Sequence, residues 1–374
     1  MLKRKAKELP SPKDRAENDD QQKRRKTDLI FTWDKKEWVP ARRFKANVIE
    51  LKDNAKSKVF IVKKTLKAFK GTDGLKPPRE VILLNGVPDC NRFVKPIDII
   101  ASEAHAEYTL IFESYKLGDL SDWRNAQFEM QGCKEIPEAF LWRFLAHMTQ
   151  ALAVLQNIAG PYPDERSAIL HRDIKPDNIL VTKNGTSFPS FKLHDFGCSS
   201  EYDAELVNQD VWGGTYAWSP PEHPFVHSLA AEVWCMGACL HYIAFGEFMY
   251  QENDVDFLGK LSAKDRALAM KFRYKYKSDQ EWYKAWAPRL VTPINMGYSS
   301  RTKFPVNREL KESSYKPRYS DDINMWMMEC LNPHPSERPS LETLVKEMIP
   351  NARMMLQKLG GRSALVDMEL ELVD

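Results

Sequence analysis

Residues 171–180 read HRDIKPDNIL and residues 195–197 read DFG, and these two stretches are the most informative part of the sequence. Asp173, Lys175 and Asn178 lie close together in the first stretch, and Asp195 opens the second. Carboxylate and amide oxygens are the ligands that Mg²⁺ prefers, and a nearby lysine adds charge that stabilises an anion. An ordinary polar turn does not require these four residue types in this order. The pattern therefore predicts a site that handles a metal-bound anion.

Together the two stretches resemble the catalytic loop and the magnesium-binding triplet of the eukaryotic protein kinase family, over roughly residues 30–350. The resemblance implies transfer of a phosphoryl group from ATP to a protein hydroxyl. It implies that Asp173 accepts or orients the hydroxyl proton and that Lys175 reaches the transferred phosphate. Asn178 and Asp195 are then the residues that hold Mg²⁺ and, through it, ATP.

This family implies an α+β fold of two lobes, and the apolar patterns agree with it. Short β-like runs come first and predict a small, antiparallel, β-rich N-lobe over about residues 29–113. Helical periodicity follows and predicts a larger C-lobe over about residues 114–350. The expected strands are 46–51, 58–66, 97–101 and 108–112, with a short helix over 79–84. The expected C-lobe helices begin at residue 136 and continue at 230–245, within 255–290, and at 322–331 and 341–359, with a β region and an Asn-Gly turn between residues 169 and 193.

The N-lobe lysine that contacts the α- and β-phosphates in this family lies in the run VFIVKK, residues 59–64. The run resembles the family's Val-Ala-Ile-Lys strand, which assigns Lys63 to ATP binding and leaves Lys64 as the alternative. Only one of them can point inward, because neighbouring side chains in a strand point to opposite faces. With Lys63 in place, Ile61 replaces the alanine that normally lies above the adenine. Glu80, in the short helix, is the expected partner that orients the lysine.

The loop that covers the phosphates normally reads G-x-G-x-x-G-x-V, but its best match, ARRFKANV at residues 41–48, has no glycine. Glycine allows backbone N–H groups to approach phosphates closely. Either Arg42, Arg43 and Lys45 supply charge instead, or they are surface residues on a β-turn, which is the interpretation we favour. Glu113 begins the hinge between the lobes, where backbone groups would hold the adenine.

Two further resemblances concern the support of the catalytic loop. Ser-Pro-Pro-Glu at residues 219–222 resembles the family's Ala-Pro-Glu sequence, so Glu222 is expected to form a buried ion pair with Arg338. Glu232 stands where the family has an aspartate. Its longer side chain is expected to alter the hydrogen bonds back to the catalytic loop.

Charge is unevenly distributed along the 374 residues. The net charge is +3, but residues 1–28 hold ten Lys/Arg against six Asp/Glu and almost no apolar residues. This segment is expected to be a disordered basic tail. Its clusters at residues 3–5 and 23–26 resemble a bipartite signal for a nuclear importer, with a tail that carries no address as the alternative. Residues 351–374 are expected to form a C-terminal tail.

Composition excludes several classes of protein. The sequence is 43% hydrophobic and 29% charged, as in globular proteins, and it lacks the run of about 18 apolar residues that a membrane span needs. The balanced charge does not indicate a nucleic-acid partner. Six cysteines without a C-x-x-C pair, and the lack of a signal peptide, favour a reducing intracellular location, nuclear or cytoplasmic. Cys235 and Cys239, one helical turn apart, are expected to be buried apolar residues.

We therefore expect a serine/threonine protein kinase that uses ATP and Mg²⁺ and acts on a protein substrate with a Ser or Thr acceptor. Lys175 and Thr215 are the residues that serine/threonine kinases of this family use at their positions. The alternative is a pseudokinase scaffold with weak or no turnover, because of the degenerate phosphate loop. A third and weaker interpretation is a nucleic-acid-associated module that uses the basic tail and residues 271–277.

Overall fold

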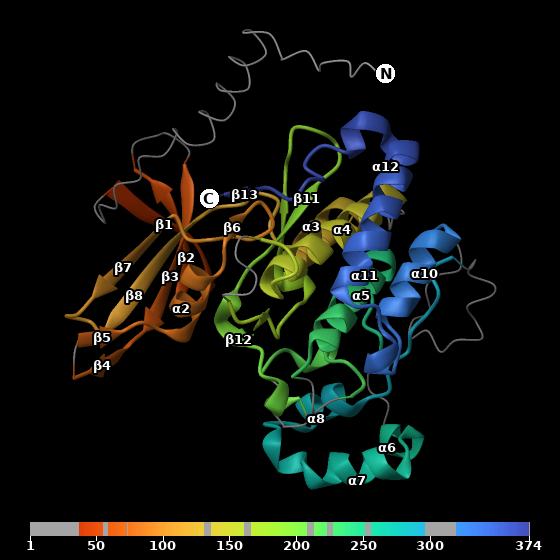
Figure 1. Ribbon diagram of the computed structural model, residues 1–374. Helices are drawn as coiled ribbons and strands as arrows, with labels where there is room; N and C mark the ends of the chain where they lie inside the picture. Colours follow the sequence, from red (N-terminus) through yellow and green to blue (C-terminus); the bar gives the residue numbers. More distant parts are fainter. Residues whose placement is uncertain are drawn as a thin grey trace, which may run out of the picture.

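The computed structural model describes residues 37–373, apart from 55–58, 73, 131–135, 161–165, 208–212, 223–226, 251–255 and 296–318. A twisted sheet forms one lobe, and a larger, mainly helical lobe lies beside it (Figure 1). The expected α+β, two-lobed architecture is confirmed. The basic tail and its two clusters lie outside the described residues. Among the residues described, no helix has both the length and the apolar character needed to cross a bilayer.

The N-lobe is built on a five-stranded antiparallel sheet with the order β1-β2-β3-β8-β7. Its strands are β1 (Trp38–Lys45), β2 (Val48–Asp53), β3 (Phe60–Lys67), β7 (Asp98–Ser102) and β8 (Glu107–Glu113). Four of them match the expected strands, but β1 occupies much of the stretch that was expected to be a phosphate loop. The small hairpin β4 (Phe69–Gly71) and β5 (Gly74–Lys76) was not predicted. The helix α2 (Arg79–Gly86) follows Pro78, as the sequence indicated.

Pairing within this sheet decides which side chains share a face. Ile61 lies opposite Leu51 in β2, and these two residues pack with Ile111 in a small buried cluster. Lys63 has the same parity as Ile61 in β3, whereas Lys64 lies opposite Val48 and points to the other face. The expectation that Ile61 lies above the adenine is therefore wrong, because Ile61 belongs to this cluster on the opposite face.

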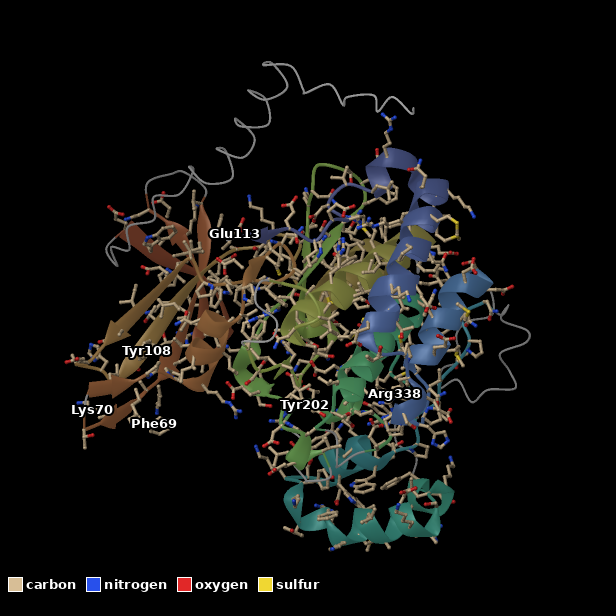
Figure 2. All side chains as sticks on the ribbon, in the orientation of Figure 1. Phe69, Lys70, Tyr108, Glu113, Tyr202 and Arg338 are labelled. Atoms are coloured by element: carbon tan, nitrogen blue, oxygen red, sulfur yellow. The ribbon has the colours of Figure 1, made fainter. Side chains whose placement is uncertain are left out.

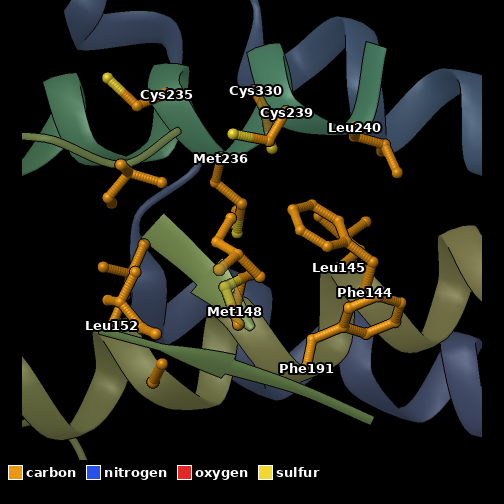
Figure 3. Close-up of a cluster of buried hydrophobic side chains, with 14 of the residues drawn as sticks. Phe144, Leu145, Met148, Leu152, Phe191, Cys235, Met236, Cys239, Leu240 and Cys330 are labelled. Atoms are coloured by element: carbon orange, nitrogen blue, oxygen red, sulfur yellow. The ribbon is translucent and has the colours of Figure 1, made fainter. Parts of the chain in front are cut away.

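The C-lobe is organised around two long helices, α4 (Glu138–Leu155) and α5 (Leu229–Phe245). Figure 3 shows side chains from α4, from α5 and from the strand β11 filling the space between these elements. Cys235 and Cys239 are fully buried on α5, in the apolar role that their spacing predicted. Ser228 caps the start of α5, and Gly246, with φ of 78°, ends it.

Shorter elements complete the C-lobe. They include α3 (Leu120–Arg124), the π-helical turns Asn125–Glu129 and Leu344–Met348, β9 (Ile169–Leu170), β10 (Ile179–Thr182), β11 (Ser190–Leu193), β12 (Ser200–Glu201), α6 (Phe257–Lys260), α7 (Ala263–Lys271), α8 (Asp279–Trp286), α10 (Asp321–Cys330) and α11 (Leu341–Thr343). β10 pairs with β11 and β9 pairs with β12. Helices α7 and α8 contribute to a separate small apolar cluster at the end of the lobe away from α12 (Figure 1).

The C-terminal segment is folded against the rest of the chain rather than forming a loose tail after residue 350. Helix α12 runs from Ile349 to Ala364 with a kink at Gly361, and β13 (Leu372–Val373) then pairs with β6 (Asp89–Cys90) of the N-lobe. Arg143, fully buried on α4, donates to the carbonyl oxygens of Ala364 and Val366. The segment thus runs from the larger lobe back to the smaller one.

Candidate active site

The catalytic-loop stretch starts directly after β9, where Glu232 holds its backbone. Both carboxylate oxygens of Glu232 accept hydrogen bonds, from the N–H groups of His171 and Arg172, each at 2.8 Å. Burial raises the pKa of Glu232 to about 7, against the opposing effect of these two donors. Glu232 therefore anchors the loop through two hydrogen bonds despite its extra methylene group. Arg172 adopts a left-handed conformation with φ of 65° in the anchored turn.

Asp173 lies at the centre of a hydrogen-bonded group formed by the loop and the segment that follows it. One carboxylate oxygen accepts from the N–H and the hydroxyl group of Thr215, both at 2.8 Å. The other oxygen lies 2.9 Å from the Lys175 ammonium group and 2.9 Å from the Asn178 amide nitrogen. Lys175 also donates to the Thr215 hydroxyl at 2.7 Å. Sequence reasoning named these residues, and the structure brings them together.

A second group joins the two lobes around Asp195. The ammonium group of Lys64, on β3, lies 2.7 Å from Glu80 on α2 and 2.8 Å from Asp195 of the C-lobe. Burial opposes the ammonium form, but the charges of Asp195 and Glu80 outweigh it and raise the pKa of Lys64. Burial would raise the pKa of Asp195 too, yet Lys64 and Lys45 lower it well below its usual range. Asp195 therefore stays ionised.

The lysine at this site is Lys64, so the assignment of Lys63 is corrected. Lys63 lies on the sheet face of Ile49 and Ile111, which the strand pairing turns away from Asp195. The sequence alignment chose Lys63 because residues 60–63, Phe-Ile-Val-Lys, have an apolar residue directly before the lysine, as the family pattern does. When Lys64 is the site lysine, the residue directly before it is Lys63 and not an apolar residue. A run of apolar residues does not show which side chains of a strand face which side of the sheet. Only the pairing with β2 reveals that Lys64 faces the site.

Phe196 fixes the position of the triplet that contains Asp195. Its ring is buried and makes edge-to-face contacts with two other rings. The ring centres lie 5.1 Å apart for His171 and 5.8 Å apart for Phe93. His171 is fully buried, its Nε2 lies 3.0 Å from the His194 carbonyl oxygen, and burial lowers its pKa. Both side chains pack inward, and His171 is too buried to reach a substrate hydroxyl as a base. A Cβ at Gly197 would lie 3.3 Å from Asp195 Oδ1, a tight contact that would require the carboxylate to shift slightly.

Two other expected residues lie apart from these groups. Glu113 ends β8 where the N-lobe chain passes to the C-lobe, and Figure 2 labels it on the sheet. Its exposed side chain leaves only the neighbouring backbone for the adenine contact that was expected there. Arg338, in the larger lobe (Figure 2), forms a bidentate ion pair with Glu222, with both distances 2.6 Å, as the sequence predicted.

The residues present fit a divalent cation. The Asn178 amide nitrogen donates to the backbone carbonyl and the carboxylate of Asp173, which leaves the Asn178 side-chain oxygen as the atom suited to a metal ion. Asp195 contributes an ionised carboxylate. Both are the hard oxygen ligands that Mg²⁺ requires. In the described part of the chain, no group of three or more His, Cys, Asp and Glu side chains forms a protein-only metal site. Asn178 and Asp195 supply only part of the octahedral shell of Mg²⁺, and waters or phosphate oxygens would supply the rest.

Residues 45–349 match the family model described as "Protein kinase domain". Among curated proteins, the chain is 32% identical over 146 residues to dual specificity mitogen-activated protein kinase kinase 1 of Dictyostelium discoideum, covering 38% of this chain and 19% of that protein. It is 32% identical over 127 residues to a calcium/calmodulin-dependent protein kinase kinase of Emericella nidulans, covering 27% and 23%. It is 26% identical over 215 residues to a dual specificity mitogen-activated protein kinase kinase of Drosophila melanogaster, covering 56% and 46%. Each match thus spans less than half of the relative.

Proposed function

The chain belongs to the protein kinase domain family, and from this premise we propose that it transfers the γ-phosphate of ATP to serine or threonine hydroxyls of protein substrates. The observation that carries the proposal is the geometry of Asp173. Its carboxylate is held at 2.8–2.9 Å by Thr215, Lys175 and Asn178. A carboxylate fixed in this way can orient an incoming hydroxyl group and accept its proton.

The other residues have roles that follow from their charge. Lys64, oriented by Glu80, would bind the phosphates of ATP, and Lys175 would stabilise negative charge on the transferred group. Asn178 and Asp195 would hold Mg²⁺, which when bound neutralises phosphate charge. The direct contact between Lys175 and Thr215 supports serine/threonine specificity, because these are the residues that serine/threonine kinases of the family use.

The test uses the full chain with labelled Mg-ATP and a mixed peptide library containing Ser, Thr and Tyr acceptors. We expect transfer to Ser and Thr, and a loss of at least about 100-fold in Asp173→Asn, since general base catalysis contributes about 10²–10⁴-fold. Asp195→Ala should be equally impaired, while the melting temperatures of both variants confirm that they fold. Phosphotyrosine as the sole product would overturn the specificity, and equal background in all three proteins would overturn the activity.

The second candidate is a pseudokinase scaffold, which the absence of glycine from residues 41–48 favours. Without glycine, fewer backbone N–H groups can approach the phosphates. The transfer assay separates the two candidates, because a scaffold gives no signal above the Asp173→Asn background at any ATP concentration.

We also propose that the basic clusters at residues 3–5 and 23–26 direct the protein to the nucleus through an importer. A reporter fused to residues 1–30 should accumulate in nuclei. Replacing Lys23, Arg24, Arg25 and Lys26 with alanine should abolish the accumulation. A cytoplasmic distribution of the unaltered fusion would contradict the proposal.

A further inference from the structure

The β1–β2 hairpin holds three cationic residues, Arg42, Arg43 and Lys45, in the stretch that matches the family's glycine-rich loop, and the structure separates their roles. Only Ala46 and Asn47 stand between the two strands. The guanidinium carbon of Arg42 lies 4.7 Å from the centre of the Phe44 ring, and its Nη2 lies 3.9 Å from Asp122 Oδ2. Arg43 donates to the carbonyl oxygen of Ala46 within the hairpin. Lys45 alone of the three reaches the active site, where its ammonium group lies 3.2 Å from Asp195 Oδ2.

A bulge in β1 explains why Lys45 points inward. Arg43 is paired with Ile49, but Lys45 is paired with Val48, so one extra residue, Phe44, interrupts the register. Without it, Arg43 and Lys45 would point to the same face, because side chains two apart in a strand do so. The bulge places Arg43 on the face of Ile49 and Lys45 on the opposite one.

Strand pairing then aligns Lys45 with the active-site lysine. Lys45 pairs with Val48 in β2, and Val48 pairs with Lys64 in β3. Directly paired residues of antiparallel strands project from the same face of the sheet. The two ammonium groups therefore approach one carboxylate from the same side, Lys64 at Oδ1 and Lys45 at Oδ2 of Asp195.

The two lysines differ in their freedom to move. The Lys64 side chain is 13% exposed and is held by Glu80 as well as Asp195, whereas the Lys45 side chain is 64% exposed. In the part of the chain that the structure describes, Lys45 forms an ion pair with Asp195, and Glu80 acts on it only at longer range. An exposed ion pair contributes little free energy, so the Lys45 ammonium group can leave Asp195 and bind a more highly charged anion instead. A triphosphate bound beside Asp195 is such an anion.

We propose that Lys45 is a phosphate-binding residue of the nucleotide site, which supplies by side-chain charge the anion contact that glycine backbone N–H groups supply elsewhere in the family. This inference rests on the proposed function. It predicts selectivity for the charged part of the ligand. Lys45 should matter for a nucleoside triphosphate and not for the nucleoside alone, because adenosine carries no phosphate.

The test measures equilibrium binding of Mg-ATP and of adenosine by calorimetry to the wild type and to Lys45→Gln, Lys45→Arg and Arg43→Gln. We expect Lys45→Gln to weaken ATP binding about tenfold, the lower end of the range for a hydrogen bond to a charged group because the site is exposed. Adenosine affinity should change less than about twofold. Lys45→Arg should restore most of the ATP affinity. Arg43→Gln, which removes a neighbouring charge from the opposite face, should leave both affinities unchanged.

Salt provides a second measurement with the same proteins. Charge–charge attraction at an exposed site is screened as ionic strength rises. The difference in ATP affinity between the wild type and Lys45→Gln should therefore shrink from 50 mM to 500 mM salt.

Three results would overturn the inference: equal ATP affinities for the wild type and Lys45→Gln, tighter ATP binding by Lys45→Gln, or equal losses for ATP and adenosine. Tighter binding would mean that Lys45 blocks the carboxylate. Failure of this inference differs from failure of the proposed function. A wild type that binds ATP with the predicted dependence on Lys45 but transfers no phosphate leaves the inference standing and removes the kinase activity.

Discussion

Glu232 illustrates how one residue couples the catalytic loop to solution pH. It is 3% exposed, and the charged groups that face it are Arg172 and Asp173. Its pKa rises from 4.5 to about 7 on folding, with burial as the main cause. The folded protein therefore keeps the proton after the unfolded chain has lost it. Consequently the free energy of unfolding falls as the pH rises from about 4.5 to about 7, and it changes little above that.

We predict that Glu232→Gln removes this component of the pH dependence. Between pH 4.5 and pH 7 the wild type should lose about 3 kcal/mol relative to the variant, which is the pKa difference multiplied by 1.36 kcal/mol per unit. Urea unfolding at several pH values measures it, and the difference between the two curves isolates the residue from other titrating groups. Glu342→Gln, at an exposed position, is the control. A pH-independent difference between the wild type and Glu232→Gln would contradict the assignment.

At the level of single elements, a largely buried ion pair joins the segment before α5, through Glu222, to the segment before α11, through Arg338. The Arg338 side chain is fully buried, binds Glu222 through two nitrogens and lies 5.0 Å from the Trp234 ring centre. Removing one partner of a buried pair leaves the other charge without compensation. The pair therefore matters for folding even where it adds little relative to an apolar substitute.

We predict that Glu222→Gln lowers the free energy of unfolding by about 3–5 kcal/mol, since it strands a buried guanidinium group. The matched control is Glu369→Gln, which breaks an exposed pair with Arg353 and should cost less than about 1 kcal/mol. Chemical denaturation of the two variants gives the comparison. Similar small losses for both would show that Arg338 finds sufficient partners in the carbonyl oxygens of Asn332 and Ala230.

Individual elements and residues differ in how far the sequence could predict them. The long helices α4 and α5 were predictable because their apolar positions recur along helical faces, and Asp173, Asn178 and Asp195 because their types and spacing are specific. Lys64 could not be identified from the sequence, because the frame that ends at Lys63 fits the family pattern better and only the pairing with β2 assigns each lysine to a face. The sequence named Lys45 together with Arg42 and Arg43, but it could not show which of the three reaches the site, for a similar reason. The direction of Lys45 depends on a one-residue bulge, which leaves no mark in the alternation of a basic strand.

Across the whole molecule, the C-terminal segment connects the two lobes through hydrogen bonds to each of them and an ion pair to the smaller one. Arg92, fully buried in the N-lobe, binds the carbonyl oxygens of Asp367 and Glu369 and the side chain of Asp367. Gln150 on α4 contacts both Arg92 and the Met368 carbonyl oxygen. Sequence patterns could not indicate this, because most of the partners are backbone carbonyl groups, which every residue has. The segment is part of the folded domain.

We predict that ending the chain at Gly361 lowers the free energy of unfolding by at least about 3 kcal/mol, because it strands the buried guanidinium groups of Arg92 and Arg143. Ending the chain at Glu369 keeps their carbonyl partners and removes β13, so it should cost much less. Denaturant unfolding of both proteins measures the difference. Equal stability of the two truncated chains would mean that the segment is not part of the cooperative unit.

We propose that the two lobes together build one phosphoryl-transfer site, in which Lys64 of the N-lobe meets Asp195 of the C-lobe. The most direct measurement is the initial rate of phosphate transfer from ATP by the wild type, Lys64→Met and Lys63→Met under identical conditions. We predict a loss of about 100-fold or more for Lys64→Met, since it removes a preorganised charge from the site, and a rate within about threefold of the wild type for Lys63→Met. Equal rates for Lys64→Met and the wild type, or a loss confined to Lys63→Met, would contradict the claim.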